Sequence, residues 1–253
     1  MNCGTVSAAG PVNAPTESPA TYFRQISMSL GTRLLLRLFI ALPLFAAFLF
    51  IPAGTFRFWQ GWALLAVSFF PTSVAFLYFY KHDPQLMVRR LESKEKVSEQ
   101  KWLIRLLKPA FFLVLLLPSL DYRFGWTRTH LRAVPLWLEL LAQALFFGGY
   151  LIVFWTLNTN SFAARTIRVE PGQQVISTGP YGLVRHPMYS GSILMFLSIP
   201  LVLGSYIGLF ASVPLVSFYV LRLLNEEQVL RQELPGYPEF CLKTRFRLVP
   251  FVW

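Results

Sequence analysis

Residues 177–191 read S-T-G-P-Y-G-L-V-R-H-P-M-Y-S-G, an irregular polar stretch in a chain that is otherwise mostly apolar. Its Thr-Gly-Pro at 178–180 is a turn signal, and His186 precedes Pro187, which disfavours helical dihedral angles at the histidine. We therefore expect a rigid elbow that leads into a helix beginning near Met188. Tyr and Arg also mark membrane boundaries, so an interfacial anchor is the simpler interpretation of this stretch.

Composition indicates an integral membrane protein. Hydrophobic residues make up 55% of the 253 residues and charged residues 14%, and the mean hydropathy is +0.49. The net charge of +11 could suggest a nucleic-acid partner, but the basic residues alternate with long apolar segments, as membrane flanks do, and no nucleic-acid motif is present. Cys3 and Cys241 lie at opposite ends, which argues against a disulfide framework or a metal site.

Six apolar segments are long enough, or nearly so, to cross a membrane, since a spanning helix needs roughly 20 apolar residues. They cover residues 34–53, 59–80, 103–120, 135–157, 188–203 and 206–224. The expected fold is thus a polytopic all-α membrane bundle. Residues 1–29 would form a disordered tail, 30–157 four spans with a surface helix near 81–102, and 158–253 the functional core.

The apolar run 188–224 is too long for one span. Its 37 residues would extend about 55 Å as a single helix, against a hydrocarbon core of about 30 Å. Gly204-Ser205 near the midpoint predicts a turn, so the last two spans would form a helical hairpin. With six spans, 19 of the 23 Lys and Arg residues share one side with both termini and the elbow. The positive-inside rule places that side in the cytoplasm.

The hairpin returns the chain to the elbow, where ionisable and aromatic residues can join it. Arg222 and Glu226 are spaced i, i+4 and can pair on one helix face. Glu227 follows, and then Tyr237 in a Pro-Gly-Tyr turn and Arg245 in the basic tail. These groups could simply neutralise one another at the helix ends. Ionisable groups massed at the mouth of a membrane bundle nevertheless favour a functional site.

Four motifs occur in a fixed order over the second half of the chain. They are Thr-Gly-Pro-Tyr at 178–181, Arg-His-Pro-Met-Tyr at 185–189, Glu-Glu at 226–227 and Arg-Phe-Arg-Leu-Val-Pro at 245–250. This set resembles the isoprenylcysteine carboxyl methyltransferase family and, more loosely, the phospholipid and thiol methyltransferases of the same membrane superfamily. The resemblance is strong over residues 158–253. It is weaker at residues 83–91 and 121–126, where the sequence is similar to bacterial members of the family.

The resemblance implies an integral membrane methyltransferase that uses S-adenosylmethionine, with both ligands bound on the cytoplasmic side. The acceptor would be lipid-like, most readily a prenylcysteine-type carboxylate. A carboxylate needs no general base, so His186 would position the ligand, whereas a thiol or amine acceptor would give it a proton to remove. The implied cofactor-binding residues are Thr178, Gly179, Pro180, Tyr181, Val184, Arg185, His186, Pro187, Tyr189, Gly191, Glu226, Glu227 and Tyr237. The implied catalytic residues are Arg185, His186, Arg222 and Arg245, and no metal ligand is expected.

Two other classes of function share parts of this pattern. Membrane sterol reductases resemble it in the Arg-His-Pro-x-Tyr elbow and a C-terminal Tyr…Arg…Pro pattern, but they bind NADPH. They are longer, and the present chain has Gly191-Ser192 where Gly-Asp would be expected. A non-enzymatic scaffold or transporter is the third interpretation. Prolines within the spans could mark broken helices, although such prolines are more often tolerated kinks.

Overall fold

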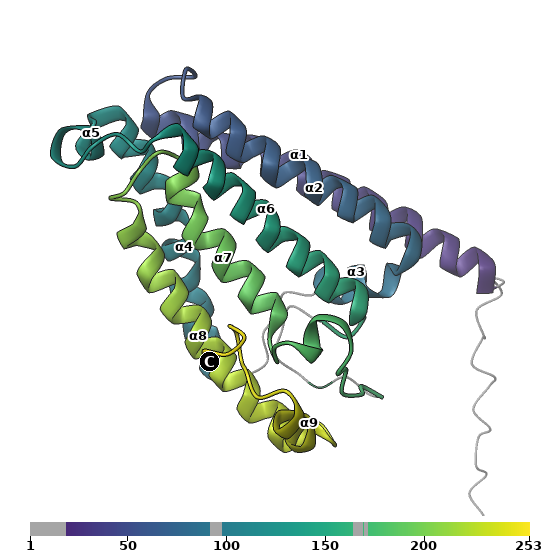
Figure 1. Cartoon of the computed structure of the whole chain (residues 1–253). Helices are drawn as coiled ribbons and strands as arrows, with labels where there is room; N and C mark the ends of the chain where they lie inside the picture. Colours follow the sequence, from purple (N-terminus) through teal and green to yellow (C-terminus); the bar gives the residue numbers. More distant parts are fainter. Residues whose placement is uncertain (1–18, 92–97, 164–168, 170–171) are drawn as a thin grey trace, which may run out of the picture. The chain divides into compact units, whose positions relative to one another are not determined.

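The computed structural model describes residues 19–91, 98–163, 169 and 172–253, and every regular element in these residues is helical (Figure 1). This confirms the predicted all-α bundle. The chain divides between Leu38 and Phe39 into two units, and the site lies in the second. Helix α1 (Pro19–Ala53) begins in the first unit and ends in the second. Residues 19–29, expected in the tail, are therefore helical, and a proline is well tolerated where a helix begins.

Among the described residues, five helices are long and apolar enough to cross a membrane, within α1, α2, α4, α6 and α8. Helix α7 has 16 residues, a rise of about 24 Å, so it is apolar but shorter than these five candidate spans, and its crossing of the membrane stays a prediction. The elements after α1 are α2 (Trp59–His82), α3 (Pro84–Leu91), α4 (Ser98–Phe124), α5 (Trp126–His130), α6 (Leu136–Thr159), the 3-10 turn η1 (Gly179–Gly182), α7 (Pro187–Val202), α8 (Leu209–Glu233) and α9 (Tyr237–Lys243).

Helices α6 and α7 cross at two glycines. A Cβ atom built on Gly191 would lie 2.5 Å from the Gly149 carbonyl oxygen, and one built on Gly149 would lie 2.6 Å from the Gly191 carbonyl oxygen. No side chain larger than hydrogen fits at this crossing. The two glycines therefore let α7 lie directly on α6, which fixes the position of the elbow at the start of α7.

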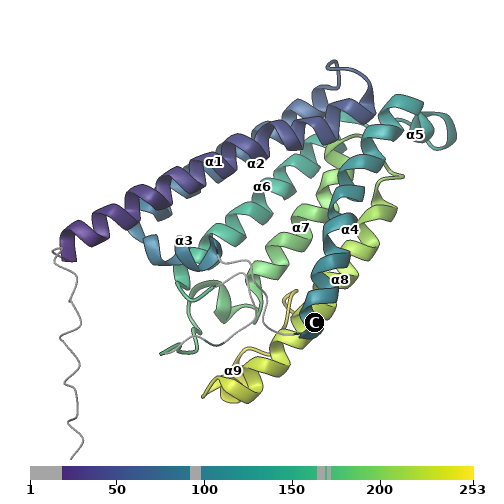
Figure 2. The same cartoon turned by 180° about the vertical axis from the view of Figure 1, so that it is seen from behind.

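Helices α7 and α8 form the predicted hairpin, with the start of α7 and the end of α8 at the same end of the bundle (Figure 1, Figure 2). Gly204 follows α7 with φ +71°, a conformation that glycine adopts readily. The turn is anchored by buried Asp121 at the end of α4, which accepts hydrogen bonds from the Ser205 and Thr127 hydroxyls and, at 2.6 Å, from the Thr127 amide. A carboxylate far along the chain thus holds the hairpin turn.

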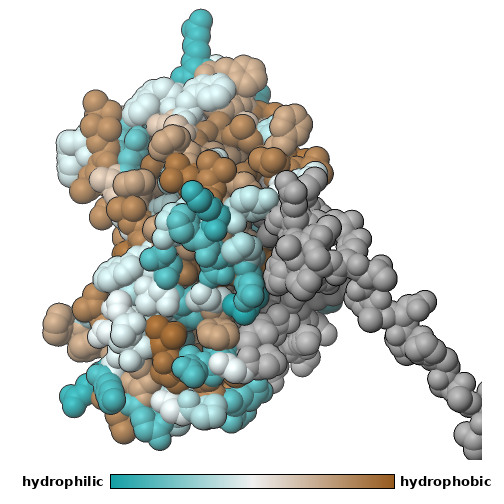
Figure 3. All heavy atoms as spheres, turned by 90° about the vertical axis from the view of Figure 1, so that its right-hand side faces the viewer, coloured by the Kyte–Doolittle hydropathy of each residue, from teal (hydrophilic) through white to brown (hydrophobic). Residues whose placement is uncertain are grey.

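The outer surface of the spanning helices is apolar. Phe70, Leu77 and Trp137, for example, are all more than half exposed. On the face shown in Figure 3, hydrophobic residues cover much of the body of the bundle, and hydrophilic residues gather mainly in the lower part, towards the end that carries α9. This distribution is that of a multi-pass membrane protein with its polar chemistry at one end.

Candidate active site

The elbow is shaped by its prolines and by one glycine. Pro187 is the first residue of α7, and His186 precedes it with φ −127° and ψ 62°, outside the helical region. Gly179 has φ +58°, and a Cβ atom there would lie 3.0 Å from the Thr159 hydroxyl, so this turn packs closely on the end of α6. The segment is therefore held as a rigid elbow between α6 and α7.

The C-terminal segment pairs with the elbow through the backbone. The amides of Arg185 and His186 donate to the carbonyl oxygens of Phe246 and Arg247 at 2.8 and 3.0 Å. The Ser190 hydroxyl donates to the Leu248 carbonyl oxygen at 2.6 Å. The two halves of the site, more than fifty residues apart in sequence, thus meet as the hairpin requires.

Glu227 is a buried counter-ion shared by three basic side chains. Its Oε1 lies 3.1 Å from Arg185 Nε and 3.3 Å from His186 Nε2, and its Oε2 accepts a hydrogen bond from Arg247 Nε at 3.0 Å. The Arg185 contact lacks hydrogen-bond geometry, so this buried Nε–H has no hydrogen-bond acceptor among the described residues. Glu227 therefore ties α8 to the elbow and to the C-terminal segment.

Two buried phenols of the site, one of them beside His186, remain protonated at neutral pH. The Tyr237 hydroxyl lies 3.4 Å from His186 Nε2, and burial, aided by the negative charge of Glu227, raises the pKa of Tyr237. Burial also raises the pKa of Tyr181 to about 12, against the hydrogen bond that Asn160 Nδ2 donates to its oxygen at 2.9 Å. Both hydroxyls can therefore donate hydrogen bonds to a ligand.

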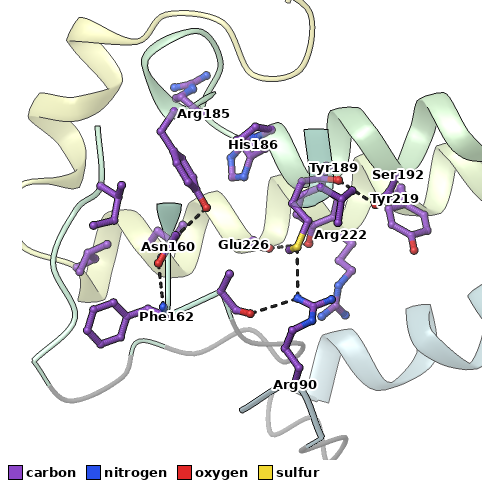
Figure 4. Close-up of a pocket in the computed structure, with 18 of the residues that line it drawn as sticks. Arg90, Asn160, Phe162, Arg185, His186, Tyr189, Ser192, Tyr219, Arg222 and Glu226 are labelled. Atoms are coloured by element: carbon purple, nitrogen blue, oxygen red, sulfur yellow. Dashed lines mark hydrogen bonds between the residues drawn. The ribbon is translucent and has the colours of Figure 1, made fainter. Parts of the chain in front are cut away.

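A cavity of about 760 Å³ opens beside the elbow (Figure 4). Helix α8 lines it with a single stripe of residues spaced three or four apart, which puts them on one face. In order, the stripe is Leu215, Tyr219, Arg222, Glu226 and Leu230, and Leu234, directly after the helix, continues it. The Tyr189 hydroxyl donates to Glu226 Oε2 at 2.6 Å. A polar centre at Arg222 and Glu226 thus separates the two apolar ends of this stripe, and with them the two ends of the cavity.

We call these ends the inner and outer compartments. The Phe196 ring lies 5.1 Å from the Tyr219 ring and 6.0 Å from the Phe111 ring, measured between centroids. These contacts hold the aromatic residues of the inner compartment together. The inner compartment consists of Ile104, Leu107, Phe111, Phe112, Phe196, Leu215 and Tyr219. The outer compartment, around the packed cluster of Leu234, Tyr237 and Phe240, adds Asn160, Gln173, Gln174, Val175, Ile176, Tyr181 and Leu230.

Comparison with known proteins addresses this same part of the chain. Residues 137–235 match the phospholipid methyltransferase family. The match runs from α6 to the end of α8, includes the elbow, and covers less than half of the chain. This family belongs to the membrane methyltransferase superfamily that includes the isoprenylcysteine carboxyl methyltransferases, which confirms the resemblance found in the sequence.

A second comparison points to the reductases. The chain is 31% identical over 91 residues to a delta(14)-sterol reductase of Mus musculus, a match over 35% of this chain and 22% of the reductase. The chain thus spans about a fifth of the length of that curated relative. The family match supports a membrane methyltransferase core, and the shorter likeness keeps a reductase as the competing interpretation.

Eight residues assigned by the methyltransferase resemblance line the cavity, and seven do not. Gly191 packs against α6, and Glu227 is the buried counter-ion described above. Arg245 is exposed, and it is Arg247 that contacts Glu227. The cavity-lining residues are Tyr181, Arg185, His186, Pro187, Tyr189, Arg222, Glu226 and Tyr237. The others, Thr178, Gly179, Pro180, Val184, Gly191, Glu227 and Arg245, support the elbow or lie beside it.

Several lining residues were missed in the sequence. Arg90 lies in the 83–91 stretch that already resembled bacterial methyltransferases, so this resemblance could have pointed to it. Asn160, Gln173 and Gln174 lie in the polar stretch before the elbow, and nothing in their sequence pattern distinguishes them from ordinary loop residues. Only the fold brings them to the outer compartment.

Proposed function

We propose that this chain is an S-adenosylmethionine-dependent methyltransferase of the membrane, which methylates the carboxylate oxygen of a lipid-like acceptor such as a prenylcysteine. The observation that carries the proposal is the cavity, in which a polar centre with one described carboxylate joins an apolar inner compartment to a mixed outer one. The family match over residues 137–235 supports the same reaction class.

The outer compartment fits the donor. Its described residues combine apolar surface for an adenine ring with amide and phenol groups that can hydrogen-bond a ribose, and Tyr181 and Tyr237 are protonated donors there. Glu226 borders this compartment and can balance the ammonium and sulfonium charges of the donor. Arg185, whose Nε–H has no hydrogen-bond acceptor among the described residues, also lines the cavity.

The inner compartment fits a hydrocarbon tail. From Glu226 to Leu215 the stripe on α8 descends by about 16 Å, and its inner end is surrounded by Phe and Leu side chains of α4 and α7. Helices α4 and α8 both have the length and composition of spanning helices. An acceptor with an apolar tail can therefore lie in the inner compartment with its head at the polar centre.

The residues of the chain have little acid–base work to do in this reaction. When bound, S-adenosylmethionine supplies an activated methyl group, so that a carboxylate oxygen gains a C–O bond while the C–S bond breaks and its electron pair stays on sulfur. No proton leaves the acceptor. His186, held between Glu227 and Tyr237, therefore serves to position the ligand, and the cavity serves to align the reactants and exclude water.

The second candidate is an NADPH-dependent sterol reductase, which the mouse relative supports. NADPH carries several phosphate groups, which proteins usually bind with Arg, Lys or backbone amides. The described lining of the cavity as a whole includes four basic residues, Arg90, Lys108, Arg185 and Arg222, so its charge is compatible with either ligand. The methyltransferase is preferred because the family match over residues 137–235 is to a methyltransferase family.

Binding to the purified protein tests the donor site. We expect S-adenosylhomocysteine, the product of the donor, to raise the melting temperature of the wild-type protein, and NADPH to leave it unchanged. Loss of a charge-assisted contact in Glu226→Gln should weaken binding of labelled S-adenosylmethionine about tenfold or more. The matched control is Glu233→Gln, because Glu233 is exposed on the same helix. Stabilisation by NADPH alone would establish the reductase instead.

The acceptor is tested separately. Wild-type protein in nanodiscs is incubated with methyl-labelled donor and N-acetyl-S-farnesyl-L-cysteine, and the product is treated with base. A carboxyl methyl ester releases labelled methanol under these conditions, whereas N-methyl and S-methyl products do not. Label that resists base would contradict O-methylation while leaving methyl transfer itself in place.

A further inference from the structure

The inner compartment ends at the same depth on three helices. The lining stops at Phe111 and Phe112 on α4, at Phe196 on α7 and at Leu215 on α8. One helical turn further from the elbow, each helix carries a residue that is buried and does not line the cavity. These three described residues are Leu115, Ile199 and Ala211, none more than 3% exposed. The compartment is therefore closed at its inner end by packed side chains.

We call Phe111, Phe196 and Leu215 the floor of the inner compartment. The Phe196 ring meets the Phe111 ring edge-on, with the ring planes 78° apart. Both rings pack against the buried core cluster to which Leu215 and Ile199 belong. The fully buried Ser212 hydroxyl of α8 donates to the Phe196 carbonyl oxygen at 3.1 Å and so joins α8 to α7 at this level. The floor is thus part of the packed core.

The wall beside the floor is backed by α1. The Phe112 ring of α4 stacks on the Phe48 ring of α1, with the two centroids 4.4 Å apart. Leu49, the next residue of α1, is fully buried in the same core cluster as Leu215. A hydrocarbon chain that reaches the floor therefore meets packed side chains beside it as well as beneath it.

Two helices give the same depth for the compartment. Tyr189 to Phe196 on α7 and Arg222 to Leu215 on α8 are equal distances along the chain, a rise of about 10 Å each. Measured from Glu226, the depth on α8 is about 16 Å. An extended hydrocarbon chain advances about 1.3 Å per carbon, so a straight tail of about eight to twelve carbons reaches from the polar centre to the floor.

We propose that the floor limits the length of the acceptor's tail, so that the cavity accepts an extended tail of up to about twelve carbons and rejects longer ones. The inference rests on the proposed function and adds the size of the tail and the residues that set it. Protein interiors are close-packed, so a longer tail has to displace Phe196 or Leu215, and such overpacking weakens binding. These floor residues determine specificity, and no bond to them forms or breaks.

Ligands of graded length test the floor without turnover. The full-length protein in nanodiscs is titrated with N-acetyl-S-alkyl-L-cysteines that share one head and carry straight tails of eight, twelve or sixteen carbons. Leu215→Phe raises the floor and Phe196→Ala lowers it. The matched control is Val213→Phe, because Val213 is on the same helix, is 61% exposed and does not line the cavity. The affinity of each variant is divided by that of the wild type for the same ligand, so that partition of the ligand into the bilayer cancels.

We expect Leu215→Phe to weaken binding of the twelve-carbon tail about tenfold or more and to leave the eight-carbon tail unchanged, as for overpacking at the end of the chain. Phe196→Ala should strengthen binding of the sixteen-carbon tail by a similar factor, and Val213→Phe should match the wild type with all three ligands. Ratios that do not depend on tail length in the floor variants, or an equal length dependence in Val213→Phe, would overturn the proposal.

Binding of S-adenosylhomocysteine is measured first in each protein, to separate the tail from the donor site. If Leu215→Phe has lost it, Phe196→Ala decides, and an unchanged affinity for the sixteen-carbon tail there overturns the proposal. Donor binding and methyl transfer by the wild type, with ratios independent of tail length, would contradict the floor alone. Failure of the wild type to bind the donor would instead contradict the proposed function.

Discussion

At the scale of single residues, the neighbouring carboxylates Glu226 and Glu227 have different roles. Glu226 faces the cavity and is bonded to Tyr189, whereas Glu227 faces away from it, towards Arg185 and Arg247. Consecutive residues of a helix point about 100° apart, so two such side chains cannot share one environment. One carboxylate is thus available to a ligand, and the other holds the walls of the site together.

Glu227→Gln should therefore unfold more easily. The substitution leaves Arg185 buried without its counter-ion, which lowers the unfolding free energy by about 3 kcal/mol. This value is the lower end of the range for a broken buried ion pair, because the other partner, Arg247, is partly exposed. Denaturant titration of the protein in detergent measures the change, with Glu233→Gln as the exposed control. Wild-type stability in Glu227→Gln, together with lost donor binding, would instead assign Glu227 to the ligand.

At the scale of elements, the α6–α7 crossing determines where the elbow can lie. Gly191 was assigned to the cofactor by resemblance, and its position against Gly149 gives it a packing role. The elbow begins α7, so any separation of the two helices moves His186 and Tyr189 away from α8. Close helix approach through small residues is common in membrane bundles.

The crossing can be tested with a single methyl group. Gly191→Ala should lower the unfolding free energy by about 1–3 kcal/mol, as expected for overpacking, and should weaken donor binding by displacing α7. Gly148→Ala is the matched control on α6, because a Cβ atom there meets nothing within 4 Å. Thermal unfolding in detergent compares the two variants. Equal stability of both would mean that the helices move apart at no cost.

At the scale of the whole molecule, the charge distribution predicts the orientation in the membrane. We expect the end that carries α9 to face the cytoplasm and the end that carries α5 to face the other side, following the positive-inside rule. In a background without Cys3 and Cys241, Thr129→Cys and Glu239→Cys place one exposed thiol at each end. A membrane-impermeant maleimide added to intact cells should label position 129 and not position 239. Labelling of position 239 alone would invert the topology.

Much of this architecture follows from the sequence. The length of the apolar segments predicted the spans, because a spanning helix has to match the thickness of a bilayer. Gly204-Ser205 predicted the hairpin turn, and the Pro residues of the elbow predicted the break before α7, because both depend on local backbone preferences. The sequence also indicated that the elbow and the end of α8 meet, since a hairpin allows no other arrangement.

The tertiary structure decided which side chains meet. It showed that Arg247 rather than Arg245 bonds Glu227, that Gly191 packs against α6, and that Arg90 of α3 reaches the cavity. Such contacts depend on the rotation of each helix about its axis and on the path of long loops. The periodicity of apolar residues does not specify that rotation when nearly every face of a helix is apolar. The sequence alone therefore determined a membrane hairpin with a polar elbow, and only packing between distant elements determined which of its charged groups face a ligand.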